Sequence, residues 1–471
     1  MLACSNESLY EDFNFLPETP PVVEEMCTFV SMEQASSVAQ AFLNKHIDAA
    51  ISTRMAASEP TITTVEEDGV PQMYIINYPN GGWAIVSATR NYFPILAFSE
   101  KGYFVLNEEA PGGLLAWMED TQESIKRSVV LDDETRFNVR SMWRRYEAKE
   151  NDAFFEIEHN NAGTTRSWSR FNERVAELQQ QYHLLDYRFY RLSDLLFTCA
   201  GAALPSWSIQ GLYNRAIEFQ SPLEFTIVGI RVEAISHLIG PLLTTRWHQN
   251  YPFNSATPFR DAGCGPVAMA QIMNFHRFPQ QIIHNGHFIN WNNMPDAART
   301  NSEAGSAPQL IAYAGLVLGA SQWPGGTAVF PWRVVEGFQW ASYSATRRNH
   351  NNSEVINELI NNRRPVMMFG SRNTVNVTNS HYWVCDGVIR GGQRIFYFAK
   401  FLKQGWIYVR GSHHVNCSYM CGCNPGVVLQ EFTMFHMNWG WDSRHNGWFT
   451  GANSPLGNFQ HHRRNYFIHP R

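Results

Sequence analysis

The sequence lacks the features that would place it in a membrane or on nucleic acid. No apolar run approaches the roughly 18 residues that a helix needs to span a bilayer. The formal net charge is −5, from 37 basic and 42 acidic side chains, so the overall charge does not recruit phosphate-rich partners. Basic pairs such as Arg144-Arg145 and Arg463-Arg464 are typical of a solvated surface. We therefore expect neither a nucleic-acid partner nor a membrane-spanning helix.

The eight cysteines also lack the even spacing of a small disulfide-rich domain. Three of them lie close together in the C-terminal part, at Cys417, Cys421 and Cys423, shortly after His413-His414. A disulfide, a zinc site and reduced surface thiols are the open alternatives for this cluster. Because the spacing Cys-x3-Cys-x-Cys fits no usual zinc ribbon, we predict no metal and no other cofactor.

The N-terminus shows no charged segment followed by an apolar one, as a complete secretory signal would. Residues 2–5, Leu-Ala-Cys-Ser, nevertheless look like the end of a bacterial lipoprotein signal. If the natural start lies upstream, Cys4 would carry lipid, and otherwise these residues are an ordinary N-terminal segment. Residues 1–27 are acidic and rich in proline, which predicts a tether.

What the chain does have is a cysteine in an unusual setting. In the segment 261–273, a glycine turn delivers Cys264 to the start of an apolar, helix-compatible run, and Pro266 suits the first turn of that helix. The free N–H groups and the dipole at a helix N-terminus lower the pKa of a thiol and favour a thiolate nucleophile. Taken alone, such a residue is more often a core cysteine.

Three further segments favour the nucleophile. A predicted strand that begins after Ser380 and ends at Asp386-Gly387 contains His381, an aromatic segment contains Asn438, and an upstream segment contains Gln249. A cysteine nucleophile, a histidine base, an asparagine that orients the imidazole and a glutamine that donates to an oxyanion form the set used in papain-like acyl transfer. Because these residues lie far apart in the sequence, they would have to meet through the fold.

The same segments resemble the streptopain family of bacterial cysteine peptidases. The matching motifs are Gly263-Cys264 with Ala268-Met269-Ala270-Gln271-Ile272-Met273, His276 and Pro279; Asn438-Trp439-Gly440-Trp441; Gln249 with Pro252-Phe253-Asn254; Asn290-Trp291-Asn292-Asn293-Met294-Pro295; and residues 353–370. The resemblance covers about residues 236–471, and a weaker one covers the N-terminal region, where an Asn-Gly-Gly-aromatic turn precedes Ile85-Val86-Ser87-Ala88.

The resemblance implies a role for each of these residues. Cys264 would be the nucleophile, His381 the general base, Asn438 its orienting partner and Gln249 an oxyanion donor. Trp439 would shield the His–Asn pair from water, and Gly263 and Ser380 would border the substrate cleft. The implied fold is α+β, with a helical part that carries the cysteine and an antiparallel β part that carries the histidine and asparagine. An inhibitory α+β prodomain would precede it.

The sequence departs from the family at the rim of the expected cleft. Ser380 stands where the family has glycine, and Asp442-Ser443 replaces a glycine pair. An insertion at residues 388–435 replaces a short hairpin, and the glycine-rich C-terminal loop is missing. These departures concern substrate preference rather than the core chemistry, and a loop next to the site is expected to act as a lid or rim.

The pattern along the chain predicts four parts. They are a tether at 1–27, a prodomain at 28–112, a helical extension or linker at 113–235, and a peptidase domain at 236–471 with the insertion 388–435. Expected helices begin at Ser31 and cover 114–125, 171–195, 264–277, 307–320 and 353–362. Expected strands cover 74–78, 83–88, 94–99, 103–106, 225–228, 365–370, 381–388, 395–400, 406–410 and 427–449.

The leading hypothesis is a secreted or cell-surface cysteine endopeptidase made as a zymogen. Its partners would be protein or peptide substrates and its own prodomain, which would act as an intramolecular inhibitor. An amidase or transpeptidase with the same residues is an alternative. A catalytically silent, surface-attached binding protein on the same scaffold is another, although such a scaffold would not need all four polar residues.

Overall fold

A computed structural model describes most of the chain. It covers residues 28–106, 110–128, 185–191, 225–371, 380–401, 405–410, 430–450 and 463–471, and a few positions between 139 and 147. The chain divides into two compact units. The first comprises Met1–Val30, Asp133–Ala234 and Gly392–Glu431, and the second comprises Ser31–Asp132, Ile235–Gly391 and Phe432–Arg471. All of the candidate site residues lie in the second unit.

The second unit begins with the predicted capped helix, α1 (Met32–His46). The Ser31 hydroxyl accepts a hydrogen bond from the Gln34 N–H at 3.3 Å, and the Gln34 side chain accepts one from the Ser31 N–H at 3.0 Å. This capping box satisfies two N–H groups that would otherwise be unpaired at the helix start. The apolar stripe expected from the sequence is buried except for Met32, which is 44% exposed, and the helix is confirmed; the buried members are Ala35, Val38, Ala39, Phe42 and Leu43.

A second, short helix, a four-stranded antiparallel sheet and a third helix follow. The elements are α2 (Ala49–Ala56), β1 (Thr61–Glu67), β2 (Val70–Asn77), β3 (Trp83–Ser87), β4 (Ile95–Ser99) and α3 (Gly112–Arg127). The predicted hairpin of β2 and β3 is confirmed, but the strand predicted at 103–106 is wrong. There the Asn77 side chain accepts from the Phe104 N–H at 2.7 Å and donates to its carbonyl at 2.8 Å. These two bonds satisfy the backbone in place of a strand ladder.

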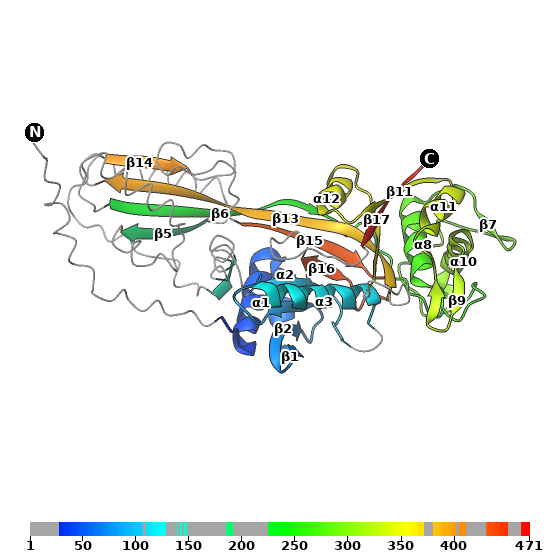
Figure 1. The fold of residues 1–471 in the computed structure, drawn as a ribbon, viewed down its shortest axis with the longest axis horizontal. Helices are drawn as coiled ribbons and strands as arrows, with labels where there is room; N and C mark the ends of the chain where they lie inside the picture. Colours follow the sequence, from blue (N-terminus) through cyan, green and yellow to red (C-terminus); the bar gives the residue numbers. More distant parts are fainter. Residues whose placement is uncertain are drawn as a thin grey trace, which may run out of the picture. The chain divides into compact units, whose positions relative to one another are not determined.

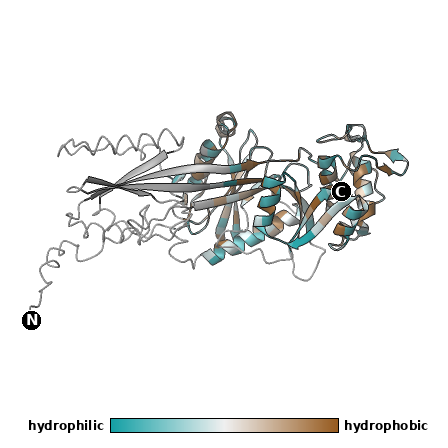
Figure 2. Cartoon of the chain, turned by 90° about the horizontal axis from the view of Figure 1, so that it is seen from above, coloured by the Kyte–Doolittle hydropathy of each residue, from teal (hydrophilic) through white to brown (hydrophobic). Residues whose placement is uncertain are grey.

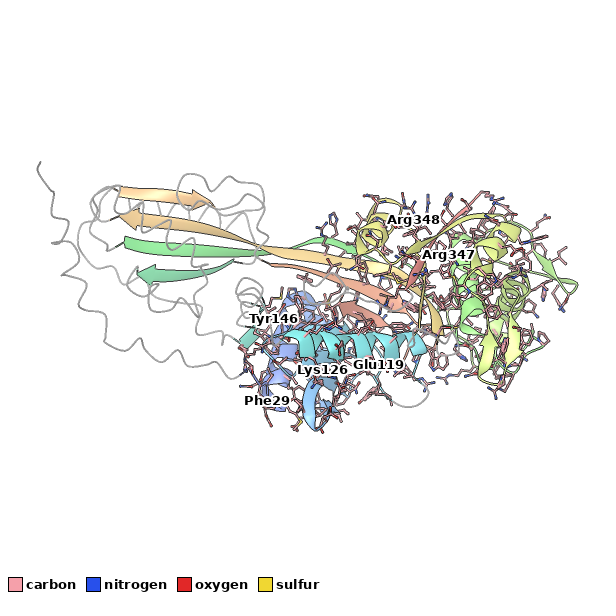
Figure 3. The ribbon with its side chains drawn as sticks, in the orientation of Figure 1. Phe29, Glu119, Lys126, Tyr146, Arg347 and Arg348 are labelled. Atoms are coloured by element: carbon pink, nitrogen blue, oxygen red, sulfur yellow. The ribbon has the colours of Figure 1, made fainter. Side chains whose placement is uncertain are left out.

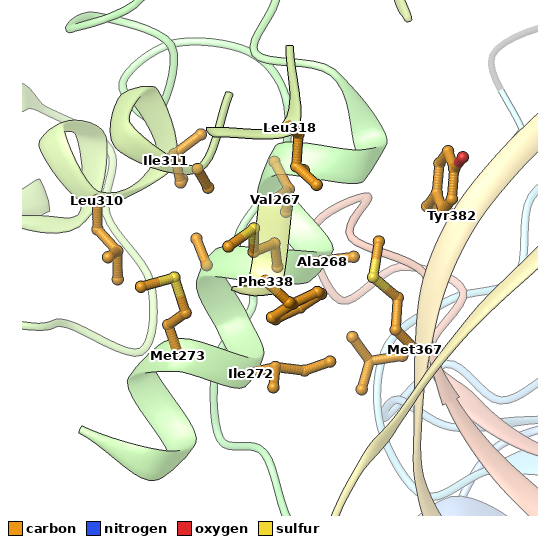
Figure 4. Packing of buried hydrophobic residues seen from close by; sticks show 14 of the residues in the cluster. Val267, Ala268, Ile272, Met273, Leu310, Ile311, Leu318, Phe338, Met367 and Tyr382 are labelled. Carbon is orange, nitrogen blue, oxygen red and sulfur yellow. The ribbon is translucent and has the colours of Figure 1, made fainter. Parts of the chain in front are cut away.

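The helices of the C-terminal part precede its strands from β12 (Val366–Ser371) onwards, as predicted, with five other strands between the helices. They are α8 (Cys264–His276), α9 (Asn301–Ala304), α10 (Ala307–Leu318), α11 (Arg333–Trp340) and α12 (Asn352–Asn361). Helix α8 is buried along most of its length. In Figure 4, Met367 projects from the sheet towards Ala268 of α8, and both belong to one hydrophobic cluster together with Tyr382 and Ile272. Helix α8 is therefore packed closely against the strands that follow it.

The first four strands of this part are very short, and the later ones are longer. They are β7 (Ile283–His284), β8 (His287–Phe288), β9 (Ser321–Trp323), β10 (Gly326–Ala328), β11 (Tyr343–Asn349), β12 (Val366–Ser371), β13 (Ser380–Phe401), β14 (Gly405–Arg410), β15 (Gln430–Asn438), β16 (Gly447–Thr450) and β17 (Arg464–Pro470). The strands from β12 onwards all follow the last described helix, α12, which fits the predicted α+β order. The strand predicted to end at Asp386-Gly387 instead continues as β13, because neighbouring strands keep pairing with it.

The N-terminal sheet and the C-terminal sheet are continuous. The order is β1-β2-β3-β4-β16-β15-β13-β12-β17-β11, so β4 and β16 form the junction (Figure 1). Trp448 pairs with Phe98, and Phe449 pairs with Ala97. One hydrophobic cluster then combines residues from both regions, including Trp83, Trp117, Trp383, Trp439 and Phe449. The two regions thus share a core and do not merely touch.

In the first unit, β5 (Leu185–Arg191) pairs antiparallel with β6 (Phe225–Ile239). The helix predicted at 171–195 is therefore wrong for residues 185–191, a segment whose three aromatic residues favour a strand. The strand predicted at 225–228 is confirmed and is longer than expected. The tether at 1–27 and the cysteine cluster at 417–423 lie outside the described residues.

Stability comes mainly from buried apolar surface. The helices near the C-terminus carry both hydrophobic and hydrophilic residues, seen as brown and teal in Figure 2. Figure 3 labels Lys126 on α3 and Arg348 on β11, which form exposed ion pairs with Glu67 and Glu354. Exposed pairs of this kind contribute only about 0–1 kcal/mol each. Among the described residues, no helix is both long and apolar enough to cross a membrane.

Candidate active site

Cys264 is the first residue of α8, where the sequence predicted it. The turn before it needs glycine, because Gly263 has a φ of +83° and a Cβ there would lie 3.0 Å from the Thr327 carbonyl oxygen. Thr327 also holds the turn through Asp261, by donating from its N–H to a carboxylate oxygen at 3.0 Å and from its hydroxyl to the backbone carbonyl at 2.7 Å. The position of the thiol is thus fixed from both sides of the turn.

The thiol of Cys264 is half-buried, and it has no disulfide partner. Burial raises the pKa of this thiol to about 11, although nearby backbone N–H groups of Tyr382 and Gly265 oppose the shift. This direction is opposite to the one expected from the helix N-terminus alone. In this arrangement the sulfur is therefore a neutral thiol at neutral pH. Its proximity to the Tyr382 N–H places it beside the strand that carries His381.

His381 lies at the start of β13 and is only 3% exposed. Its ring stacks on Trp383 with centroids 6.3 Å apart and meets the edge of Trp441 at 5.9 Å. The Nε2 atom lies 2.7 Å from the Trp439 carbonyl oxygen, which only accepts, so Nε2 carries the proton. Burial lowers the pKa of His381 to about 4, despite the opposing effect of this bond. The ring is therefore neutral at neutral pH.

Asn438 ends β15 and is 2% exposed. Its amide nitrogen donates to the Thr245 carbonyl at 2.7 Å, and its amide oxygen accepts from the Gly440 N–H at 3.2 Å and from the Gln271 side chain at 3.2 Å. Within the described part of the chain, no hydrogen bond joins His381 to Asn438 or to Cys264. The structure thus brings the predicted residues to one region without linking them as a working triad.

The remaining predicted residues lie around this centre. Gln249 is 9% exposed, and its carbonyl accepts from the Ala262 N–H at 2.8 Å, so it is held against the turn before Cys264. Trp439 is 1% exposed and packs against Trp383 with ring centroids 5.2 Å apart. Ser380 pairs with Ser371 at the start of the β12–β13 ladder.

Sequence reasoning missed several supporting residues. Gln271 and Thr245 hold Asn438, and Trp383 and Trp441 hold the His381 ring. Helical periodicity could have found Gln271, which lies seven residues, or about two turns, after Cys264. Nothing local in the sequence indicates Thr245, because it meets Asn438 only through the fold.

The N-terminal region contacts the candidate site directly. A Cβ on Gly113, in the first turn of α3, would lie 2.8 Å from the rings of both Trp383 and Trp439. In addition, an Arg463 nitrogen lies 3.3 Å from a carboxylate oxygen of Asp120 on α3. Helix α3 therefore packs on the aromatic side chains that surround His381.

No three potential ligands among His, Cys, Asp and Glu gather as a metal site in the parts of the chain that the structure describes. The alternatives for Cys417, Cys421 and Cys423 concern residues outside those parts.

Comparison with known proteins gives two family matches. Residues 247–449 match the model of the peptidase C10 family, and residues 27–125 match that of the Spi protease inhibitor. No curated protein matches the chain.

Two solved structures from Prevotella intermedia are similar to the chain. A mutant fragment of prointerpain A is 13% identical, covers 87% of this chain and 98% of its own, and has a TM-score of 0.40. Active wild-type interpain A, a cysteine protease, is 17% identical, covers 49% of this chain and 95% of its own, and has a TM-score of 0.32. Both TM-scores are low, so the family models alone carry the assignment.

Proposed function

Because the chain is a cysteine peptidase with a peptidase C10 domain and a Spi inhibitor-like prodomain, we propose that it is a secreted or cell-surface endopeptidase made as a latent zymogen. The resemblance to the streptopain family predicted from the sequence is confirmed by these matches. The proposal adds the roles of the site residues, the latency and the location to this established assignment.

In the proposed reaction, His381 takes the proton of the Cys264 thiol, and the thiolate attacks the carbonyl carbon of the scissile peptide bond. The Gln249 amide donates to the oxyanion that forms, and Asn438 orients the imidazole. His381 then gives the proton to the leaving amine, and water hydrolyses the thioester. Trp439 keeps the His–Asn pair away from bulk water, and Gly263 and Ser380 border the substrate.

The neutral thiol and the neutral imidazole support latency. A thiolate–imidazolium pair needs a thiol pKa below, and a histidine pKa above, the working pH. Here burial moves both pKa values the other way, to about 11 for Cys264 and about 4 for His381. The Nε2–H of His381 donates to the Trp439 carbonyl, so its unprotonated Nδ1 is the atom that can take the Cys264 proton, and in the described part of the chain no hydrogen bond joins the two side chains. Activation would therefore require Nδ1 of His381 and the Cys264 sulfur to come within hydrogen-bond reach.

The observation that carries the proposal is the continuity of the prodomain with the peptidase sheet. Strand β4 pairs with β16, which follows Asn438 by a short loop, and Gly113 of α3 abuts Trp383 and Trp439. Trp383 and Trp439 could not move towards α3 without displacing it, because they already contact its first turn. This coupling supports an intramolecular inhibitor that acts on the catalytic residues through their neighbours.

The test is the full chain with Cys264→Ala. The wild-type chain should convert to a shorter form that cleaves a denatured protein substrate, whereas the variant should stay uncut and inactive while melting at a similar temperature. His381→Ala should behave nearly the same. Retained cleavage by Cys264→Ala would refute the nucleophile, and equal specific activity of the uncut and the cut wild type would refute latency.

For the domain organisation we propose a tether at 1–27, a prodomain at 28–112, an extension at 113–235 and a peptidase domain at 236–471. The first helix of the extension, α3, acts with the prodomain, since the Spi protease inhibitor match continues through it to residue 125. The insertion 388–435 continues β13, the strand of His381, and returns in β15, the strand that ends at Asn438, so it is joined to both strands that carry site residues. Such a position supports a role as a rim that selects substrates. Replacing it with a short hairpin should keep cleavage of short peptides and change the cuts in a folded protein.

A further inference from the structure

We propose that Gln271 is a positioning residue that holds Asn438 in register with the nucleophile helix. Its side-chain Nε2 donates to the Asn438 Oδ1 at 3.2 Å, across 167 residues of sequence. Both side chains are buried, at 0% and 2% exposure. This inference rests on the proposed function, because Asn438 matters only if it orients His381 in the working enzyme.

The same rigid element carries the nucleophile and this support. Gln271 and Cys264 lie seven residues apart on α8, so at 3.6 residues per turn they project from nearly the same side of the helix. The hydrogen bond from Gln271 therefore fixes the position of Asn438, at the end of β15, relative to the helix that begins with Cys264. A buried helix transmits such a constraint better than a loop does.

The orientation of the Asn438 amide is determined by two backbone groups. The Thr245 carbonyl can only accept, so it requires the NH2 end of Asn438, and the Gly440 N–H can only donate, so it requires the oxygen end. If the amide were flipped, both contacts would become unfavourable. The Asn438 oxygen therefore faces α8 and can accept a second hydrogen bond, which Gln271 supplies.

This arrangement leaves the other end of Gln271 unpaired. Among the described residues, its Oε1 is buried without a hydrogen-bond partner. An unpaired buried carbonyl costs free energy, whereas an apolar side chain of the same shape would avoid that cost. A role in packing alone thus favours a residue such as methionine at this position, and a role as a donor to Asn438 favours glutamine.

Two variants separate these roles, with kcat expressed per alkylatable Cys264 after maturation of the full chain. Gln271→Met keeps the length and removes the donor, and it should lower kcat by about tenfold with KM unchanged. Gln271→Glu should be pH-dependent. Burial raises the pKa of such a glutamate, so below that pKa its O–H donates to Asn438, and above it the carboxylate repels the Asn438 oxygen. The ratio of variant to wild-type kcat should fall about tenfold between about pH 5 and pH 8.

The control is Gln339→Met on the exposed side of α11, which should keep wild-type kcat. Variants that do not mature by themselves are cut with a trace of mature wild type, and the activity of that wild type is subtracted.

A wild-type kcat in Gln271→Met, or a ratio of Gln271→Glu to wild-type kcat that does not change with pH, would overturn the inference. If only Gln271→Glu fails to fold, the kcat of Gln271→Met alone tests the inference. If both fail, Gln271 supports the fold and the inference is wrong. An inactive wild type would instead refute the proposed function.

Discussion

The Nε2 atom of His445 lies 2.6 Å from the carbonyl oxygen of Val105. His445 belongs to the loop that follows Asn438, and Val105 lies just after the last strand of the prodomain sheet. The neighbouring Phe104 ring meets His445 edge-on, with centroids 5.2 Å apart. This contact joins the prodomain to the loop that follows Asn438.

We expect His445→Ala to loosen the prodomain. Removing one partner of this part-buried hydrogen bond costs about 1–3 kcal/mol, which raises the open fraction by roughly 5-fold to 150-fold. In a Cys264→Ala background, which prevents self-cleavage, the prodomain should be cut faster by an added protease by that factor. His287→Ala, on the exposed strand β8, should leave the rate unchanged. Equal rates for the two variants would show that this contact does not hold the prodomain.

Asp386→Ala should destabilise the peptidase strongly. Asp386 is fully buried, lies 2.6 Å from the His436 Nδ1, and accepts from the Leu243 N–H at 2.9 Å. Breaking a buried pair by removing one partner costs about 3–5 kcal/mol. Denaturant unfolding of the Cys264→Ala chain measures this loss. Glu123→Ala removes an exposed pair with Arg127 and should cost less than about 1 kcal/mol. Similar losses in both variants would contradict the prediction.

Acid should destabilise the latent chain through His381. Its pKa is lowered to about 4 by burial, whereas an unfolded histidine titrates near 6.5. Between these two pKa values the unfolded state binds a proton that the folded state does not bind. The contribution of His381 to the free energy of unfolding is therefore complete above about pH 6.5 and decreases as the pH drops towards 4. The contribution is about 3 kcal/mol at most. Melting of the Cys264→Ala chain against pH should show this slope.

His381→Gln in the same background should reduce the slope. It should not abolish the slope, because burial also lowers the pKa of His276 and that of His350 to about 4. An unchanged slope in the His381→Gln chain would mean that His381 is not held neutral.

Gln249→Ala should lower kcat by about 10²- to 10³-fold, the typical loss of an oxyanion donor. The melting temperature should change little, because the contact of Gln249 with Ala262 uses its backbone carbonyl. Steady-state kinetics on a peptide substrate, with active sites counted by Cys264 alkylation, measure the effect. An unchanged kcat would mean that backbone N–H groups alone stabilise the oxyanion.

The sequence by itself determined the elements whose signals are local. The Ser31–Gln34 capping box, the β2–β3 hairpin and the Gly263 turn before α8 all depend on residues within a few positions of one another. The motifs around Cys264, His381, Asn438 and Gln249 were likewise visible as short segments, and they predicted the family that the comparisons confirm.

Only the tertiary structure decided the rest, because it depends on pairings between distant residues. The segment 103–106 is not a strand since the Asn77 side chain satisfies its backbone, and residues 185–191 form a strand since β6 pairs with them. The elevated thiol pKa of Cys264 comes from burial by other elements, which outweighs the helix terminus. The partners of Asn438 come from α8 and from residue 245, and a polar side chain in a core bonds to whichever groups the fold places beside it.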